Sequence, residues 1–151
     1  MYDGITNIGI YLDKETFPEI DLPYKANIGD AGFDIKSAES LVIPKGNRSM
    51  VHTGVYLQIP YGWECQVRPR SGLALKEGIT VLNSPGTIDF SYCGEVCVIL
   101  QNCSRKDFFV DSGDRIAQLV FKRVPTINLS ILSEKPTNEL RGSKGFGSSG
   151  I

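Results

Sequence analysis

Short apolar or alternating runs, separated by turn residues, recur along most of the chain. Turn signals rich in Gly, Pro, Ser and Asp follow one another roughly every 8 to 12 residues, as at Gly29-Asp30, Pro44-Lys45-Gly46, Pro60-Tyr61-Gly62, Ser84-Pro85-Gly86 and Ser112-Gly113-Asp114. The runs between them are rich in β-branched and aromatic residues or alternate apolar with polar residues. We expect strands over 41–44, 51–59, 63–68, 79–82, 94–102, 106–110 and 116–124. This regular spacing predicts an all-β sandwich or barrel.

The pattern allows one helix. Residues 71–77, Ser-Gly-Leu-Ala-Leu-Lys-Glu, are long enough for one or two turns. Ser71 is a residue type that caps helix N-termini, and Gly78 is of the type that ends helices. We therefore expect a short helix over 71–77 that Ser71 caps and Gly78 terminates.

Length and composition indicate one globular domain. The chain has 151 residues, with 41% hydrophobic and 22% charged residues, which is close to the average for folded domains. Sixteen Lys plus Arg against 17 Asp plus Glu leave a net charge of −1, so no basic surface for direct nucleic acid binding is expected. No apolar run approaches the length of a membrane span, and the N-terminus lacks the basic and apolar segments of a signal peptide. We expect no membrane association and no secretion.

Cysteine and histidine usage narrows the possible chemistry. The four cysteines, Cys65, Cys93, Cys97 and Cys103, form no C-x-x-C pair, and His52 is the only histidine. A Cys/His zinc site is therefore not expected, and reduced cysteines packed as small apolar residues are favoured over disulfides. Ser-His-Asp or Cys-His catalysis would require His52 as the base, and no GxSxG motif supports it.

Residues 66–77 hold the first candidate for anion binding. Arg68 and Arg70 stand beside Ser71 and Gly72 at the expected helix start. A helix N-terminus with an adjacent arginine can bind phosphate. The alternative, a capped surface helix with solvated arginines, is favoured for this segment taken alone.

A second candidate lies in residues 83–95, which we interpret as a hairpin between 79–82 and 96–100. Asp89 stands between the apolar Ile88 and Phe90, and a carboxylate in a partly enclosed hairpin can orient and deprotonate water. An Asp that only fixes the turn through backbone amides is equally compatible. Asn83 offers the donor and acceptor that a pyrimidine edge requires.

Two polar residues interrupt apolar runs elsewhere. Asp34 stands beside Phe33 and Ile35, and Gln118 lies in the expected strand 116–124, on one face with Ile116 and Val120 by alternation. Buried polar groups need partners. Each alone is more simply explained as structural.

From Ser133 the chain becomes polar and turn-rich and ends in a glycine- and serine-rich tail. Composition alone favours an ordinary flexible terminus. Arg141 and Phe146 argue for more, because they can bind an anion and cover a planar ring while the glycines admit a ligand to the backbone. No P-loop is present.

With these stretches in this order, the sequence resembles the homotrimeric dUTPases (deoxyuridine triphosphatases). The matching segments are 31–35 (Ala-Gly-Phe-Asp-Ile), 69–74 (Pro-Arg-Ser-Gly-Leu-Ala), 83–95, 113–119 (Gly-Asp-Arg-Ile-Ala-Gln-Leu) and 141–150. They span nearly the whole chain.

The resemblance implies a jelly-roll-like β-barrel over residues 1–132, of the β-clip kind found in dUTPases, with a flexible tail over 133–151 that closes an active site. It implies a homotrimer with shared active sites that hydrolyses dUTP to dUMP and pyrophosphate with Mg²⁺. Such an enzyme limits uracil incorporation into DNA and supplies dUMP for dTMP synthesis. It would work in the cytoplasm or nucleus.

Residue roles follow from the same resemblance. Asp89 would activate the water that attacks the α-phosphorus. The hairpin would bind uracil through Asn83 and backbone groups that include Gly86 and Ile88, and Tyr92 would lie against the deoxyribose.

The phosphates would be held by Arg70, Ser71, Gly72 and Gln118. Mg²⁺ would be held mainly by the substrate phosphates, and Asp34 would act on it indirectly through waters. The tail would contribute Arg141 and Ser148 to the phosphates, Phe146 over the uracil, and Gly147 as a further substrate contact.

The sequence departs from the family at Ser91, Cys93 and Ser149. Ser91 and Ser149 retain small hydrogen-bonding groups, whereas modification of Cys93 beside Tyr92 would disturb the hairpin. Two other functions remain as alternatives. A dCTP deaminase of the same fold would need an Arg-Ser-Ser second motif, where this chain has Arg-Ser-Gly, and an idle nucleotide-binding module would not need Asp89, Tyr92, Arg141 and Phe146 together.

Overall fold

The computed structural model describes residues 4–137, which form eleven strands and one short helix. The bounds of these elements are β1 Gly9–Leu12, β2 Phe33–Lys36, β3 Leu41–Ile43, β4 Arg48–Val51, β5 Val55–Gln58, β6 Trp63–Arg68, α1 Ser71–Glu77, β7 Ile79–Val81, β8 Gly86–Asp89, β9 Val98–Asn102, β10 Phe108–Val110 and β11 Arg115–Arg123. The expectation of an all-β chain with one short helix is confirmed.

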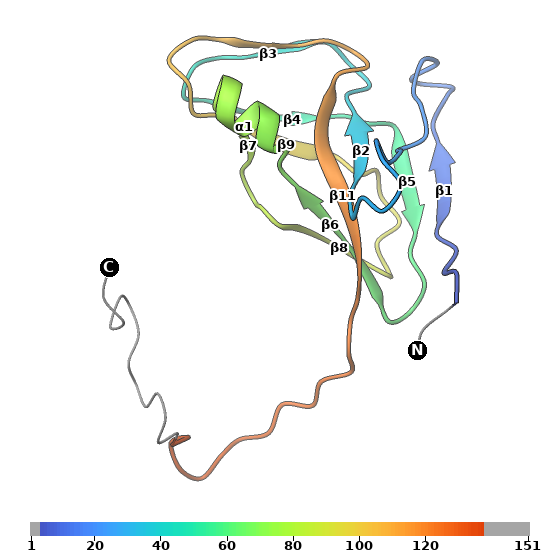
Figure 1. Ribbon diagram of the computed structural model, residues 1–151, viewed down its shortest axis with the longest axis vertical. Coiled ribbons are helices and arrows are strands. Elements are labelled where there is room, and N and C mark those ends of the chain that lie inside the picture. The colour runs from blue at the N-terminus through green and yellow to red at the C-terminus, as the bar shows by residue number, and fades with distance from the viewer. Residues whose placement is uncertain (1–3, 138–151) are drawn as a thin grey trace.

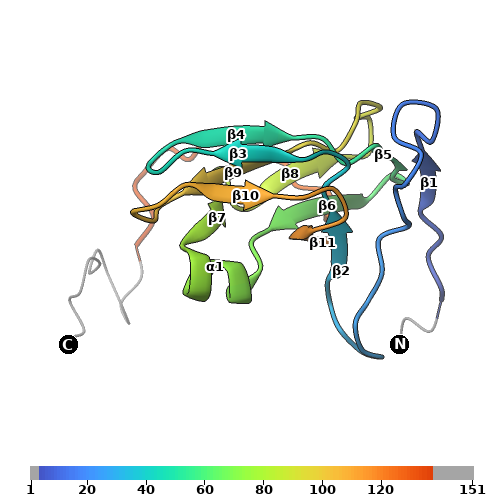
Figure 2. The same ribbon diagram turned by 90° about the horizontal axis from the view of Figure 1, so that it is seen from above.

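The strands form four antiparallel sheets. One has the order β2-β11-β6-β8, a second β4-β9-β7, and two pairs are β1-β5 and β3-β10. Figures 1 and 2 show the sheets wrapped around a common interior, with α1 beside β7. The barrel is not closed, and the arrangement is the expected jelly-roll-like fold.

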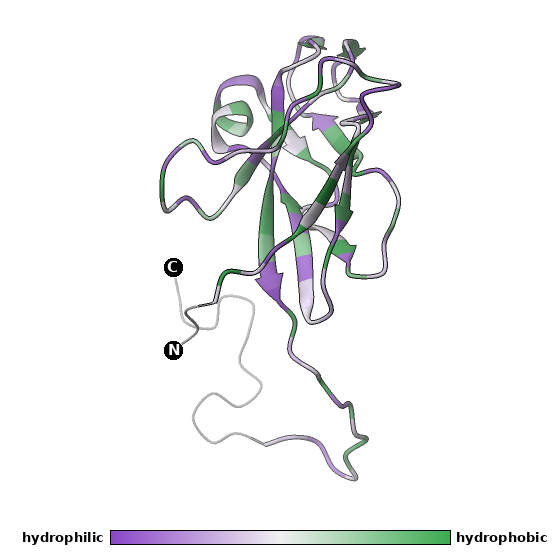
Figure 3. Ribbon diagram, turned by 90° about the vertical axis from the view of Figure 1, so that its right-hand side faces the viewer, coloured by the Kyte–Doolittle hydropathy of each residue, from purple (hydrophilic) through white to green (hydrophobic). Residues whose placement is uncertain are grey.

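The core is aliphatic and draws on every sheet. Burial alternates along strands such as β5 and β9, which puts one set of their side chains inside, and Figure 3 shows hydrophobic and hydrophilic residues following one another along the strands. Ile43, Val98 and Leu100 have no exposed area. Asn102 is also fully buried, and its Nδ2 donates to the carbonyls of Ile43 and Lys106 at 2.9 Å each. This amide links β9 to the ends of the β3-β10 pair.

The expected strand over 51–59 is two strands. β4 ends at Val51 and β5 begins at Val55, with Gly54 between them at φ +64°. A Cβ at Gly54 would lie 2.6 Å from Ile20 Cδ1. A continuous strand is thus impossible here, because the chain turns through a left-handed conformation that favours glycine and is packed against Ile20.

The expected helix over 71–77 is confirmed, and so is its end. Gly78 has the left-handed conformation at φ 68°, and its N–H donates to the Leu73 carbonyl. The expected cap at Ser71 is wrong. Arg70, in extended conformation, is the N-cap residue, and no side chain caps the helix. Ser71 already has helical geometry and is therefore one position too late to cap.

The cysteines only partly follow the expectation. All four are free thiols, so disulfides are absent as expected. Cys65 is fully buried in the core, Cys97 is half-buried, and Cys93 and Cys103 are exposed. Packing as a small apolar residue therefore describes Cys65 alone, because Cys93 and Cys103 lie in loops outside the core.

After β11 the described chain continues to residue 137 without a helix or strand and runs away from the sheets (Figure 1). Its apolar side chains are exposed, Leu129 to 96% and Ile131 to 101%. No helix within residues 4–137 has the length and apolar character needed to cross a membrane.

Candidate active site

A buried carboxylate organises one edge of the four-stranded sheet. Asp34, on β2, is only 5% exposed. Its Oδ1 lies 3.3 Å from Arg70 Nε, and its Oδ2 accepts from Arg115 Nη1 at 3.3 Å. Gln118 Nε2, on β11, donates to Oδ1 at 3.4 Å. Three of the residues expected to serve the phosphates, Asp34, Arg70 and Gln118, are therefore in one cluster.

Arg70, the residue before α1, connects the start of the helix to β11. Its Nη1 donates to the Arg115 carbonyl at 3.0 Å, and Arg70 and Arg115 line a cavity of about 180 Å³ with Ile116. Ser71 and Gly72 follow at the exposed start of α1. Sequence reasoning did not single out Arg115. Its position two residues after the glycine of the segment 113–119 was the available signal.

Gln118 faces a different side of the sheet from the one expected. The pairing of β11 with β2 has a bulge between Arg115 and Ala117, which turns both Ile116 and Ala117 into the core. Gln118 therefore shares its face with Val120 and not with Ile116. The bulge gives the amide access to Asp34, its direct cross-strand neighbour.

The hairpin residues line a second cavity. Asn83, Gly86, Ile88 and Tyr92 all contribute to a cavity of about 270 Å³. The segment is more than a turn, since β8 pairs with β6 while β7 and β9 pair with each other on either side of it. A Cβ at Gly86 would lie 3.2 Å from Val67 Cβ and 3.3 Å from Asn83 Nδ2. Gly86 thus lets the hairpin lie close to β6.

Tyr92 is fixed at both ends. Its backbone N–H donates to the Asp89 carbonyl at 3.1 Å, and its hydroxyl donates to the Glu95 carbonyl at 2.9 Å. A Cβ on Gly94 would lie 2.5 Å from the Tyr92 hydroxyl oxygen. Glycine at position 94 is therefore required for this ring position.

Glu95 anchors the end of the hairpin to the loop before β5. Its Oε1 accepts from the backbone N–H groups of Thr53 and Gly54 at 2.9 and 2.8 Å, and its Oε2 contacts His52 Nδ1 at 2.8 Å. Burial opposes ionisation, but these hydrogen bonds together lower the pKa of Glu95. The same contact with Glu95 raises the pKa of His52. Burial, reinforced by Glu95, raises the pKa of the Cys97 thiol to about 11.

Asp89 ends β8 and is exposed. It lies beside Phe90 and Tyr61, whose rings meet edge to face at 5.3 Å, and it contributes to a separate cavity of about 300 Å³. Cys93 does not line the cavity of Asn83 but a neighbouring one shared with Tyr92. Within one chain, Asp89 is thus less enclosed than the hairpin pattern suggested.

The two groups of residues are far apart within one chain. Asp89 pairs with Glu64 on β6, which pairs with Lys122, four residues along β11 from Gln118. At about 3.3 Å per residue and 4.8 Å per strand, Asp89 is roughly 16 Å from Gln118. Within one chain, the Asp89 carboxylate is therefore not close to the residues that are expected to bind the phosphates. Arg141, Phe146, Gly147 and Ser148 lie outside the described residues.

Comparisons of the sequence and of the structure with known proteins all identify dUTPases. The sequence profile of the dUTPase family matches residues 18–150. The deoxyuridine 5'-triphosphate nucleotidohydrolase of Clostridium novyi (strain NT) is 45% identical over 140 residues, covering 93% of this chain and 98% of that protein. The Wolinella succinogenes protein of the same name is 48% identical over 133 residues, covering 88% and 89%. The solved structure of Staphylococcus bacteriophage 80alpha dUTPase with dUPNHPP is 26% identical, with a TM-score of 0.87, and covers 97% of this chain and all of that one.

Proposed function

Since the chain belongs to the dUTPase family and is a dUTP diphosphatase, we propose that Asp89 activates the water that attacks the α-phosphorus of dUTP and releases dUMP and pyrophosphate. The observation that carries this proposal is the placement of an exposed carboxylate on the same hairpin as a nucleoside-sized cavity. A carboxylate in this position accepts a proton from water while hydrogen bonding aligns it.

The hairpin cavity suits a deoxyuridine. Asn83 presents a donor and an acceptor to the uracil edge, and the backbone near Gly86 and Ile88 supplies further groups. The Tyr92 ring, held by Gly94 and the Glu95 carbonyl, would lie against the deoxyribose and exclude a 2′-hydroxyl. Selection is then mainly steric and by matched hydrogen bonds.

The cluster around Asp34 suits the triphosphate. Arg70 and Gln118, held by Asp34, would bind phosphate oxygens together with Ser71 and Gly72 at the start of α1. Both Asp34 oxygens are already engaged by Arg70, Arg115 and Gln118. This fits Mg²⁺ held by substrate phosphates, with Asp34 acting through its neighbours and waters. The ion would neutralise phosphate charge in the transition state.

A shared active site reconciles the distances. Because Asp89 and Gln118 are too far apart to serve one triphosphate within a chain, the hairpin of one subunit would meet the Asp34 cluster of another in a homotrimer. The exposed apolar residues of the segment after β11, such as Leu129 and Ile131, support burial against another copy. The tail over 133–151, with Arg141, Phe146, Gly147 and Ser148, would close the site over bound dUTP.

The first test is pyrophosphate release from dUTP, UTP, dTTP and dCTP, with Mg²⁺ and with chelator. We expect rapid Mg²⁺-dependent release from dUTP alone, because the cavity selects base and sugar while the ion serves the phosphates. Ammonia release from dCTP would indicate a deaminase instead. Binding of dUTP without hydrolysis would indicate a nucleotide-binding module.

Gly94→Ala tests the role of Tyr92. The added methyl group overlaps the Tyr92 ring, whose Cζ would be 2.7 Å away, so the ring must move. We expect the kcat/KM preference for dUTP over UTP to fall by about 10-fold or more, as a displaced steric contact of 1–3 kcal/mol implies. Gly4→Ala, which adds the same methyl group where no other atom lies within 4 Å, is the control for the added methyl group itself. An unchanged preference in Gly94→Ala would remove Tyr92 from sugar discrimination.

A further inference from the structure

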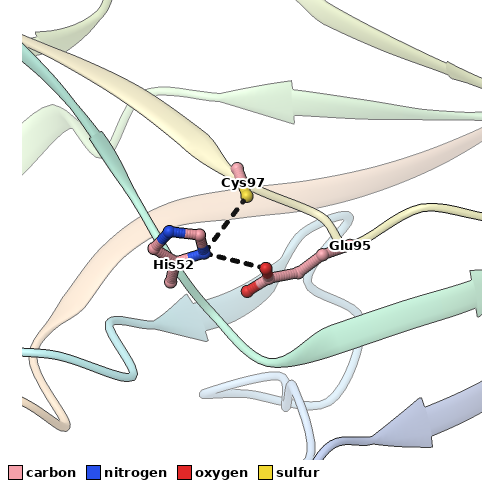
Figure 4. A group of neighbouring side chains, drawn as sticks. All are labelled: His52, Glu95 and Cys97. Carbon is pink, nitrogen blue, oxygen red and sulfur yellow. Dashed lines mark hydrogen bonds and ion pairs between the residues drawn. The ribbon is translucent and has the colours of Figure 1, made fainter.

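Three side chains outside the proposed catalytic residues converge on one point. His52 follows β4, and Glu95 and Cys97 precede β9. His52 Nδ1 lies 2.8 Å from Glu95 Oε2 and 3.7 Å from Cys97 Sγ, and Figure 4 shows both contacts meeting at the same ring nitrogen. One ligand atom from each residue lies within 4.8 Å of the others. An imidazole nitrogen, a carboxylate oxygen and a thiol sulfur are thus close enough together to contact one ion.

We propose that His52, Glu95 and Cys97 bind a divalent transition-metal ion of the zinc class. Zinc bonds of about 2.0–2.1 Å to nitrogen and 2.3 Å to sulfur place two tetrahedral ligands about 3.6 Å apart, close to the observed nitrogen–sulfur distance of 3.7 Å. The nitrogen–oxygen distance would have to grow by about half an ångström as the ion replaces the hydrogen-bonded proton. Such a shift is within reach of a carboxylate side chain.

Neighbouring groups already orient these ligands. Glu95 Oε1 is held by the N–H groups of Thr53 and Gly54, which leaves Oε2 directed at His52. The Phe17 ring stacks on the His52 ring at a centroid distance of 6.0 Å. Hydrogen-bonded carboxylates and packed imidazoles are the usual support of metal ligands. Because these side chains are already oriented in the fold, metal binding would cost less conformational entropy than it would with mobile ligands.

Charge and donor type separate this site from the magnesium proposed for the phosphates. The Glu95 carboxylate and the thiolate that forms when a metal ion displaces the Cys97 proton into solvent together balance the charge of a divalent ion. Within residues 4–137 the only ion pair of Glu95 is with His52. Thiolate and imidazole favour zinc-like ions, whereas Mg²⁺ prefers oxygen ligands alone. Three protein ligands leave a fourth position for water, and the half-exposed His52 side chain gives access from solvent.

Cobalt binding tests the site directly, because Co²⁺ bound to a thiolate gives a charge-transfer absorption. We expect the reduced full-length protein to develop this band with saturation at one Co²⁺ per chain and to lose it on addition of Zn²⁺. Cys97→Ser should abolish the band, whereas Cys93→Ser and Cys103→Ser, which change the exposed thiols, should retain it. A band that survives in Cys97→Ser would overturn the proposal.

Zinc affinity, measured by competition with a chromophoric chelator, provides the second test and needs no substrate. His52→Gln and Cys97→Ser should each weaken Zn²⁺ binding by about 100-fold or more, since loss of an outer hydrogen-bonding partner alone costs about 10–100-fold. Zn²⁺ should raise the Tm of the wild type but not of Cys97→Ser, and excess Mg²⁺ should not compete. Equal Zn²⁺ affinity in the wild type and Cys97→Ser would contradict the assignment, and melting curves without metal confirm that each variant is folded.

Discussion

Replacing Asp89 by asparagine is expected to lower the turnover of dUTP by about 10²- to 10⁴-fold, the contribution of a general base. The amide has nearly the same shape but cannot accept the proton of the attacking water. Asp89 is exposed and ends β8, so the substitution should leave the fold and the neighbouring cavity intact. The loss should therefore appear in kcat, with substrate affinity largely preserved.

Single-turnover kinetics together with the binding of a non-hydrolysable dUTP analogue separate these effects. Glu64→Gln is the matched control, because Glu64 lies directly opposite Asp89 on β6 and its loss removes a neighbouring negative charge without removing the proposed base. We expect it to change kcat only a few-fold. Wild-type turnover in Asp89→Asn would refute the assignment, and a loss of analogue binding would place Asp89 in substrate binding instead.

The second large effect is expected for Asp34→Asn, which should destabilise the protein and also impair catalysis. Asp34 is buried and holds Arg70 and Arg115. Neutralising one side of a buried ion pair costs about 3–5 kcal/mol. Because the two arginine side chains are 22% and 43% exposed, solvent screens them, and we expect a loss of about 2–3 kcal/mol in the free energy of unfolding.

Catalysis should fall as well, because Arg70 would no longer be held in position for the phosphates. Misplacement by about 1 Å can cost on the order of 100-fold in kcat/KM. Asp21→Asn is the control, since Asp21 also pairs with a cation, Lys36, but its side chain is 60% exposed. It should leave the free energy of unfolding nearly unchanged, because solvent screens an exposed ion pair. Urea unfolding and steady-state kinetics measure the two effects, and a variant with wild-type values for both would show that Asp34 positions nothing.

The sequence alone was enough to predict elements whose bounds depend on neighbouring residues, such as a helix stop or an alternating strand pattern. The helix over 71–77 and the strand over 63–68 have the expected bounds, because Gly78 can take the left-handed conformation that ends a helix and alternating apolar residues suit a half-buried strand. The motif residues were also visible without coordinates, and Asp34, Arg70 and Gln118 do form one cluster. The roles of Arg70 and Gln118 in phosphate binding and of Asp34 near Mg²⁺ remain predictions.

Some local expectations failed, each because of a backbone feature that the sequence pattern did not show. Ser71 does not cap α1, since the extended residue before the helix is Arg70. The bulge beside Ala117 reverses the face expected for Gln118. β1, β2, β4 and β8 were not predicted as separate strands, because their pairing with distant strands provides hydrogen bonds that the local sequence does not reveal.

Only the tertiary structure decided which distant residues meet. Within the described residues, Asp89 on β8 and Gln118 on β11 lie roughly 16 Å apart, because β6 separates the two strands and the residues are offset along them. The convergence of His52, Glu95 and Cys97 was likewise invisible, since their spacing matches no zinc motif and His52 is more than 40 residues from Glu95. Hydrophobic periodicity and turn residues depend on neighbours within a few positions, so the sequence alone can predict individual helices and strands. Strand order and register depend on pairing between distant segments, so only the folded structure shows which residues come together in a site.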